Sequence, residues 1–173
     1  MVKDKFQIQL LGLEDKLYRM ALSIVFDKDL ASDMTQEALM ILWERRRKLR
    51  NTANFEAYAV TVIKNLCLDV LRREKFFEEN ILPQLSESKK FYGVNYAKKD
   101  EIGLLFNLLE KVNAEHRLIF VMKTIEGYSY EEISMVTKLK HDNLRKIVSR
   151  VRQGLRNSLK ILNNEKRNKD IAG

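Results

Sequence analysis

The sequence contains few of the residues that break helices or cross-link chains. Its 173 residues include one proline (Pro83), six glycines and one cysteine (Cys67). So few turn-forming residues argue against a turn-rich β architecture and favour long helices. A lone cysteine cannot form an internal disulfide and fits a reducing compartment, so we expect a cytoplasmic protein.

Long apolar runs are also missing. No stretch of about 18 apolar residues is available to span a bilayer, which argues against membrane insertion. The N-terminal segment does not resemble a signal peptide, because Glu14 and Asp15 follow a very short apolar patch.

Recognisable catalytic or metal-binding patterns are absent as well. The sequence has no glycine-rich phosphate loop and no paired-carboxylate constellation. His116, His141 and Cys67 do not fall at zinc-ligand spacing. We therefore expect a protein that is not an enzyme and needs no cofactor or metal.

Positive charge is abundant and unevenly placed. The net charge is +8 and the pI is near 9.5, which indicates a polyanionic partner, either nucleic acid or an anionic membrane surface. Residues 45–75 carry nine Lys and Arg against three acids, and residues 138–173 carry eleven against three, whereas residues 1–44 carry five against eight. Membrane-binding chains more often have a single basic amphipathic stripe. Two separated basic blocks favour a ligand that presents phosphates over a long distance.

The chain divides at a polar stretch that holds its only proline. Residues 77–100 lack sustained periodicity, and this composition is typical of a linker. We expect an all-α protein made of two small domains over residues 1–76 and 101–163, with a basic tail over 164–173.

Apolar spacing predicts three helices in the first half, over about 6–25, 30–48 and 55–75. In the second of these, Met40 and Trp43 lie beside the core-facing stripe. A short helical module cannot easily bury so wide an apolar arc, so we interpret both residues as part of a partner surface. Cys67 falls on the apolar stripe of the third helix, where we expect a small core residue.

Polar residues follow the first arginine cluster. They form the loop 51–54 and then a stripe at helical spacing that includes Thr61, Asn65 and Arg72. The stripe is either a solvated face or a nucleic-acid surface, and its position between two arginine clusters makes the second interpretation as good as the first. A loop of small polar residues beside such a helix could accept an unstacked base.

The second half shows clear helix boundaries. Asn113 is placed to cap a helix over 114–126, with Leu118, Ile119, Met122 and Ile125 expected in the core. Ser129 and Glu132 form a capping-box pattern that opens a short helix through 136, and a long basic helix follows the turn at 137–140. A short helix, a tight turn and a longer basic helix are typical of a helix-turn-helix, whose second helix enters the major groove. The alternative is a solvated basic helix.

The first half contains the segments ASDMTQEALMILWERRRKL and NFEAYAVTVIKNLCLDVLRRE. Together they resemble region two of a bacterial RNA polymerase sigma factor of the extracytoplasmic-function group. The matching positions are Asp33, the Gln36–Glu37 pair, Trp43, Asn65, Asp69, Arg72 and Arg73; Tyr58 stands where the family more often has Trp.

The resemblance implies roles for these residues. In the family, the Trp-bearing helix docks on the β′ subunit of core RNA polymerase, and the loop and next helix melt and read the downstream promoter element. The implied polymerase-binding residues are Asp33, Gln36, Glu37, Met40 and Trp43. The implied residues for the downstream element are Arg50, Asn51, Thr52, Ala53, Asn54, Thr61, Lys64, Asn65, Arg72 and Arg73.

Residues 112–159 resemble region four of the same family, which reads the upstream promoter element. The run GYSYEEISMVTKLK departs from the family pattern at Lys138, where glycine is usual, so a non-glycine must adopt that geometry or the turn must differ. An acid at Asp142 favours a helix N-terminus but opposes close phosphate approach. The implied residues for the upstream element are His141, Asn143, Arg145, Lys146, Ser149 and Arg150.

The sequence thus predicts an alternative sigma factor whose partners are core RNA polymerase (β′ and β subunits) and promoter DNA. An anti-sigma protein clamped between the modules is common in the family, and the residues do not decide whether one exists here. One rival interpretation is a helix-turn-helix operator regulator, which would be dimeric and would leave Met40 and Trp43 unexplained. The other is a helical interaction module without salt-dependent DNA affinity.

Overall fold

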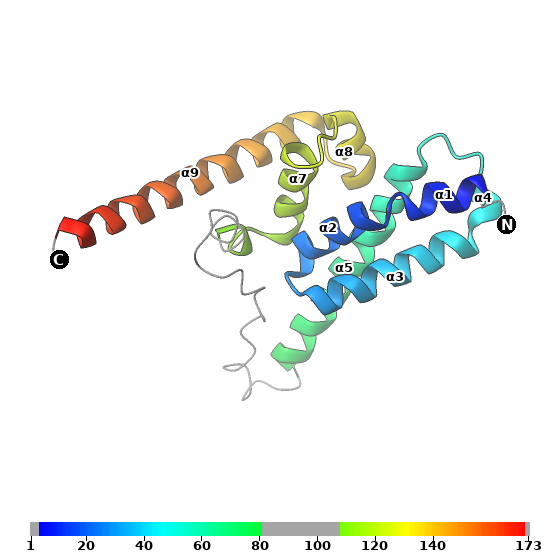
Figure 1. Cartoon of the computed structure of the whole chain (residues 1–173), viewed down its shortest axis with the longest axis horizontal. Helices are drawn as coiled ribbons and strands as arrows, with labels where there is room; N and C mark the ends of the chain where they lie inside the picture. Colours follow the sequence, from blue (N-terminus) through cyan, green and yellow to red (C-terminus); the bar gives the residue numbers. More distant parts are fainter. Residues whose placement is uncertain (1–3, 81–107, 172–173) are drawn as a thin grey trace.

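The computed structural model describes residues 4–80 and 108–171, and in these ranges the chain forms helices and no strand (Figure 1). The helices of the first module pack on one another around α2. The bounds are α1 Lys5–Leu11, α2 Glu14–Val25, α3 Lys28–Glu44, α4 Arg46–Leu49 and α5 Phe55–Asn80. The second module comprises α7 Ala114–Thr124, α8 Tyr130–Thr137 and α9 His141–Ile171.

The single helix predicted over 6–25 is wrong in one respect, because a turn at Gly12 and Leu13 divides it into α1 and α2. The backbone at both residues stays in the right-handed helical region, so the apolar stripe keeps its phase across the break. Phe6, Leu10 and Leu17 are therefore buried in one core, as the spacing indicates. The predicted helix over 30–48 is likewise divided at Arg45, where α3 ends and α4 begins.

Two helices run further than the sequence predicted. Helix α5 continues to Asn80, past the expected start of the linker at 77. Helix α9 continues to Ile171, so the expected tail is helical for most of its length. The remainder of the expected linker, residues 81–100, lies outside the described residues. Figure 1 shows α9 projecting from the body as a single long rod that ends at the C-terminus.

Helix boundaries in the second module match their sequence signals. The Asn113 side chain accepts hydrogen bonds from the first turn of α7, and Ser129 and Glu132 form the complete capping box of α8. Lys138 ends α8 with φ at 63°, so this lysine adopts the left-handed geometry in which glycine is usual.

The expectation that Ile125 belongs to the core is wrong. Ile125 is the C-cap of α7 and is 51% exposed. The helix instead buries Arg117, Phe120 and Val121 as well as its predicted stripe. It does so because it is packed between α2 of the first module and α9 of the second (Figure 1). The two modules are thus in direct contact, through α2 with α7 and α5 with α8.

Candidate nucleic-acid and polymerase interface

One face of α3 carries the residues expected to bind polymerase. The side chains of this set are exposed and recur at intervals of three and four residues, which places them on one side of the helix. They are Asp33, Gln36, Glu37, Met40 and Trp43. Met40 is 63% exposed and Trp43 is 39% exposed, so two large apolar side chains face solvent here. An exposed apolar pair with a polar surround is typical of a protein-binding surface.

Trp43 is held in place from two sides. Its ring lies 6.5 Å from the ring of Phe6, and the Arg46 guanidinium lies over it at 4.7 Å. Arg46 also donates to the Trp43 carbonyl oxygen at 2.9 Å, where α3 ends. A cation over an indole face contributes about 0.5–1 kcal/mol at an exposed site. The indole is therefore ordered before any partner arrives.

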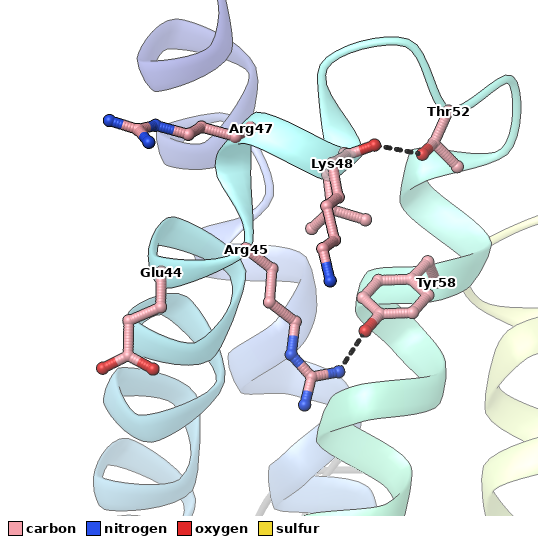
Figure 2. A pocket seen from close by; sticks show the side chains of 7 residues that line it. Glu44, Arg45, Arg47, Lys48, Thr52 and Tyr58 are labelled. Atoms are coloured by element: carbon pink, nitrogen blue, oxygen red, sulfur yellow. Dashed lines mark hydrogen bonds between the residues drawn. The ribbon is translucent and has the colours of Figure 1, made fainter.

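A pocket of about 680 Å³ opens beside this surface, between the end of α3, α4 and the start of α5. Figure 2 shows Arg45 and Lys48 extending into it towards Tyr58, while Arg47 and Glu44 point away. The Arg45 guanidinium donates to the Tyr58 hydroxyl, and Thr52 donates to the Lys48 carbonyl at the rim (Figure 2). Two cations and an aromatic ring in one cavity suit a phosphate with an adjoining base.

The loop expected to read the downstream element forms one wall of this region. Asn51, Thr52, Ala53 and Asn54 are all exposed between α4 and α5. Arg50 is paired with Asp4, the N-cap of α1, so its charge is already partly engaged. The loop is therefore exposed to solvent and is fixed at its first end by a charge pair.

The rest of the downstream set lies along α5. Asn65, Arg72 and Arg73 are exposed, Lys64 is half-buried, and Thr61 donates to the Ala57 carbonyl at 2.8 Å. Arg72 is paired with Asp69 at 3.0 Å. Thr61, Asn65 and Arg72 share one side of the helix, as predicted.

The upstream set lies together at the start of α9. Its members, His141, Asn143, Arg145, Lys146, Ser149 and Arg150, are all exposed. The Arg145 guanidinium lies 3.6 Å from Asp142 and 5.6 Å from the ring of Tyr130 on α8. Asp142, the acid expected to oppose phosphate approach, is thus paired with Arg145, and this pairing offsets its negative charge. Leu144, Val148 and Val151 fix the opposite side of α9 in the core.

Arg117 is an important residue that the sequence interpretation missed. It is 6% exposed, and its guanidinium donates to five backbone carbonyls and lies 4.3 Å over the ring of Phe26. Burial lowers the pKa of Arg117 to about 10, against the opposing effect of Glu110, so it remains charged at neutral pH. Arg117 lies three and four residues before Phe120 and Val121, on an apolar side of α7. This spacing was the one feature of the sequence that could have indicated its burial.

Two negative findings bound the chemistry. Among residues 4–80 and 108–171, no group of three or more His, Cys, Asp or Glu could hold a metal ion. No helix within the same ranges combines the length and the apolar character needed to cross a membrane. Cys67 is buried in the core, and burial raises the pKa of its thiol to about 12.

Comparison with known proteins identifies relatives of both modules. Residues 12–77 match the family model of sigma-70 region 2. The chain is 29% identical over 151 residues to the ECF RNA polymerase sigma factor SigE of Mycolicibacterium smegmatis, covering 84% of this chain but 58% of that protein. It is 27% identical over 150 residues to a probable RNA polymerase sigma factor of Haemophilus influenzae, covering 76% of this chain and 77% of that one.

A solved structure shares the fold. The sigma factor RpoE from Bartonella quintana, crystallised with the anti-sigma factor NepR, superposes with a TM-score of 0.76 at 22% sequence identity. The match covers 90% of this chain and 97% of that one, so both modules have counterparts there.

Proposed function

We propose that this chain is a sigma factor of the extracytoplasmic-function group, which binds core RNA polymerase and directs initiation at a specific set of promoters. The observation that carries the proposal is the match of residues 12–77 to sigma-70 region 2. The first module would bind the polymerase and open the minus-ten-like element, and the second would hold the minus-thirty-five-like element.

Polymerase would dock on the exposed face of α3. Trp43 and Met40 supply apolar area at its centre, and Asp33, Gln36 and Glu37 supply polar contacts around it. Buried aromatic anchors carry much of the affinity of protein interfaces, and an ordered anchor loses less entropy on binding. The contacts of Arg46 and Phe6 with the Trp43 ring support this role.

The downstream element would be read by the loop 50–54 and the adjoining face of α5. An unpaired nucleotide could place its phosphate between Arg45 and Lys48 and its base against Tyr58. Stacking on an aromatic ring contributes about 1–3 kcal/mol per base. This would favour the melted strand over the duplex.

The upstream element would be bound by α8 and α9 as a helix-turn-helix, with the N-terminal turns of α9 in the major groove. Arg145, Lys146 and Arg150 would hold phosphates or base edges, while Asn143 and Ser149 offer neutral hydrogen-bonding groups. The two modules give two weak contacts on one DNA, which raises the effective concentration of the second contact.

Such a protein acts without catalysis of its own and in the compartment that holds the polymerase, the bacterial cytoplasm. An anti-sigma protein is a further partner to be sought, as in the complex of the Bartonella relative. No part of the proposed mechanism requires a cofactor.

Core RNA polymerase pull-down tests the proposal. We expect the double variant Trp43→Ala, Gln36→Ala to lose most binding, about thirtyfold or more, since removing a central anchor costs about 2 kcal/mol or more. The matched control is Ile125→Ala, Gln153→Ala, which removes an exposed apolar and an exposed amide side chain from the second module. Circular dichroism checks that all variants stay helical. Duplex DNA binding by a wild type that never captures polymerase would instead favour an operator regulator.

A further inference from the structure

Helix α9 is much longer than a helix-turn-helix needs. Among the side chains that the structure describes, the last buried one in α9 is Leu155, at 7% exposed, yet the helix continues to Ile171. Figure 1 shows this second half running past α7 and α8 and away from the body of the molecule. Ile161 on this half is 59% exposed, so the core does not reach it. The second half of α9 is therefore accessible to a partner.

One side of α9 carries a row of exposed residues that starts within the upstream set. Counted from Arg145, they follow after four, seven, eleven and fifteen positions, which places them on one side of an α-helix. They are Ser149, Arg152, Arg156 and Lys160. Arg145 and Ser149 belong to the upstream set, and we call the last three residues the distal cations. The distal cations thus face the same way as residues proposed to read the upstream element.

The helix does not balance the charge of the distal cations. Residues 143–164 contain six Lys and Arg and no Asp or Glu. Solvated helices more often pair a cation with an acid three or four residues away, as Arg145 does with Asp142 at 3.6 Å. Successive distal cations are four residues apart, so like charges repel along this side. This charge pattern is complementary to a polyanion.

The distances along the helix axis separate bases from phosphates. At about 1.5 Å per residue, Arg152 lies roughly 10 Å from Arg145, Arg156 roughly 16 Å and Lys160 roughly 22 Å. The major groove is about 12 Å wide, so a straight helix whose first turns lie in the groove carries its later turns past the groove edge. That edge is the phosphate backbone. The distal cations would therefore meet phosphates and not bases.

We propose that Arg152, Arg156 and Lys160 form a second DNA contact of α9, which binds backbone phosphates beyond the upstream element. This inference rests on the proposed function for the placement of the first turns of α9 in the major groove. A phosphate beside the row neutralises cations that otherwise repel one another. Phosphate contacts carry no sequence information directly, so this contact adds affinity at every promoter and leaves base preference to the first turns of α9.

The test measures binding of the full chain to a fluorescein-labelled, mixed-sequence duplex of 40 base pairs by fluorescence anisotropy. The variant is Arg156→Gln, Lys160→Gln, which removes the two cations furthest from the groove and introduces good helix formers. The matched control is Lys28→Gln, Lys111→Gln, which removes two exposed charges elsewhere. Lys28 starts α3, and Lys111 lines a groove on the opposite side of α9, beside Gly154. Circular dichroism checks that both proteins stay helical.

The expected result is a smaller salt dependence. Each phosphate neutralised on duplex DNA contributes about 0.9 to the slope of log affinity against log salt concentration. We expect the slope of the variant to be smaller by about 1.8, so the ratio of wild-type to variant affinity should grow about twelvefold as KCl falls from 200 to 50 mM. The charge-conserving swap Arg156→Lys, Lys160→Arg should keep the wild-type slope. An unchanged slope in the variant, or an equal loss in the control, would overturn the proposal.

Core RNA polymerase pull-down is the separate arm. The variant should capture polymerase as wild type does, because the polymerase-binding face lies on α3. A variant that loses polymerase and keeps its DNA salt dependence would show a protein-binding surface and would also overturn the proposal. A wild type that never captures polymerase, while the variant still shows the smaller slope, would refute the proposed function and leave the second DNA contact standing.

Discussion

Lys138 adopts a backbone conformation that is unfavourable for any residue with a side chain. Its φ of 63° ends α8, and a Cβ atom in that region costs about 1 kcal/mol relative to glycine. The lysine also faces solvent at the start of the turn that leads to α9.

Replacing Lys138 with glycine should therefore stabilise the fold. We expect Lys138→Gly to raise the free energy of unfolding by about 0.5–1 kcal/mol, because the strain is relieved at a site that already needs positive φ. Thermal denaturation measures the gain. Lys138→Ala is the matched control, since it removes the same charge and keeps the Cβ; equal stability of the two variants would contradict the argument.

At the scale of the element, α8 depends on its N-terminal cap. The Ser129 hydroxyl oxygen accepts a hydrogen bond from the Glu132 backbone amide at 3.1 Å, and the Glu132 carboxylate accepts one from the Ser129 backbone amide at 2.7 Å. A helix of eight residues has few internal hydrogen bonds, so the two reciprocal bonds make up a large share of its stability.

Loss of this cap should weaken the whole second module. We expect Ser129→Ala to lower the free energy of unfolding by about 1 kcal/mol, as measured by urea denaturation. Ser129→Asp preserves an N-cap acceptor and should retain most of the stability. A wild-type midpoint for Ser129→Ala would show that tertiary packing alone holds α8.

At the scale of the whole molecule, the contact that Glu56 makes between the two modules should depend on pH. Partial burial opposes its ionisation, but hydrogen bonds from Lys16 and Tyr128 outweigh this effect, so the pKa of Glu56 lies below its ordinary value. A carboxylate whose pKa is lowered by these contacts stabilises the packed arrangement of the two modules at pH values above the ordinary pKa of glutamate. That stabilisation is lost as the pH falls through the lowered value, below about pH 4.3.

The expected outcome is a chain whose two modules separate more readily in acid. Small-angle X-ray scattering measures this as the radius of gyration. Between pH 6 and pH 3, the radius of gyration should rise more for wild type than for Glu56→Gln. The difference should stay under about 1 kcal/mol, because the pair is partly exposed to solvent. Identical pH profiles for the two proteins would show that the Glu56 contacts contribute nothing to the packing of the two modules.

Local signals in the sequence predicted the helices better than the contacts between them. Asn113, Ser129 and the helical spacing of apolar residues specify α7, α8 and the core face of α9 within a few residues. Ile125 was misplaced and Arg117 was overlooked because a helix packed on two sides buries a wider arc than its own stripe indicates. The break at Gly12 kept the helical phase, so no periodicity argument could detect it.

The binding residues follow the same division. Exposure of the α3 face and of the first turns of α9 agrees with the sequence interpretation, while their roles remain predictions. The pocket at Tyr58 and the contact between the two modules depend on residues far apart in the chain, such as Arg19 with Glu126. Pairings of that kind leave no local pattern.

The only tryptophan of the chain lies on the surface proposed to bind polymerase, with Arg46 over its ring. The intrinsic emission of this protein therefore comes from one half-exposed indole, without background from any other. Docking through α3 would remove water from that indole and shift its emission towards the blue, whereas a change at the α2–α7 contact would leave it unchanged. Polymerase binding can thus be followed in the unlabelled protein by a single optical signal.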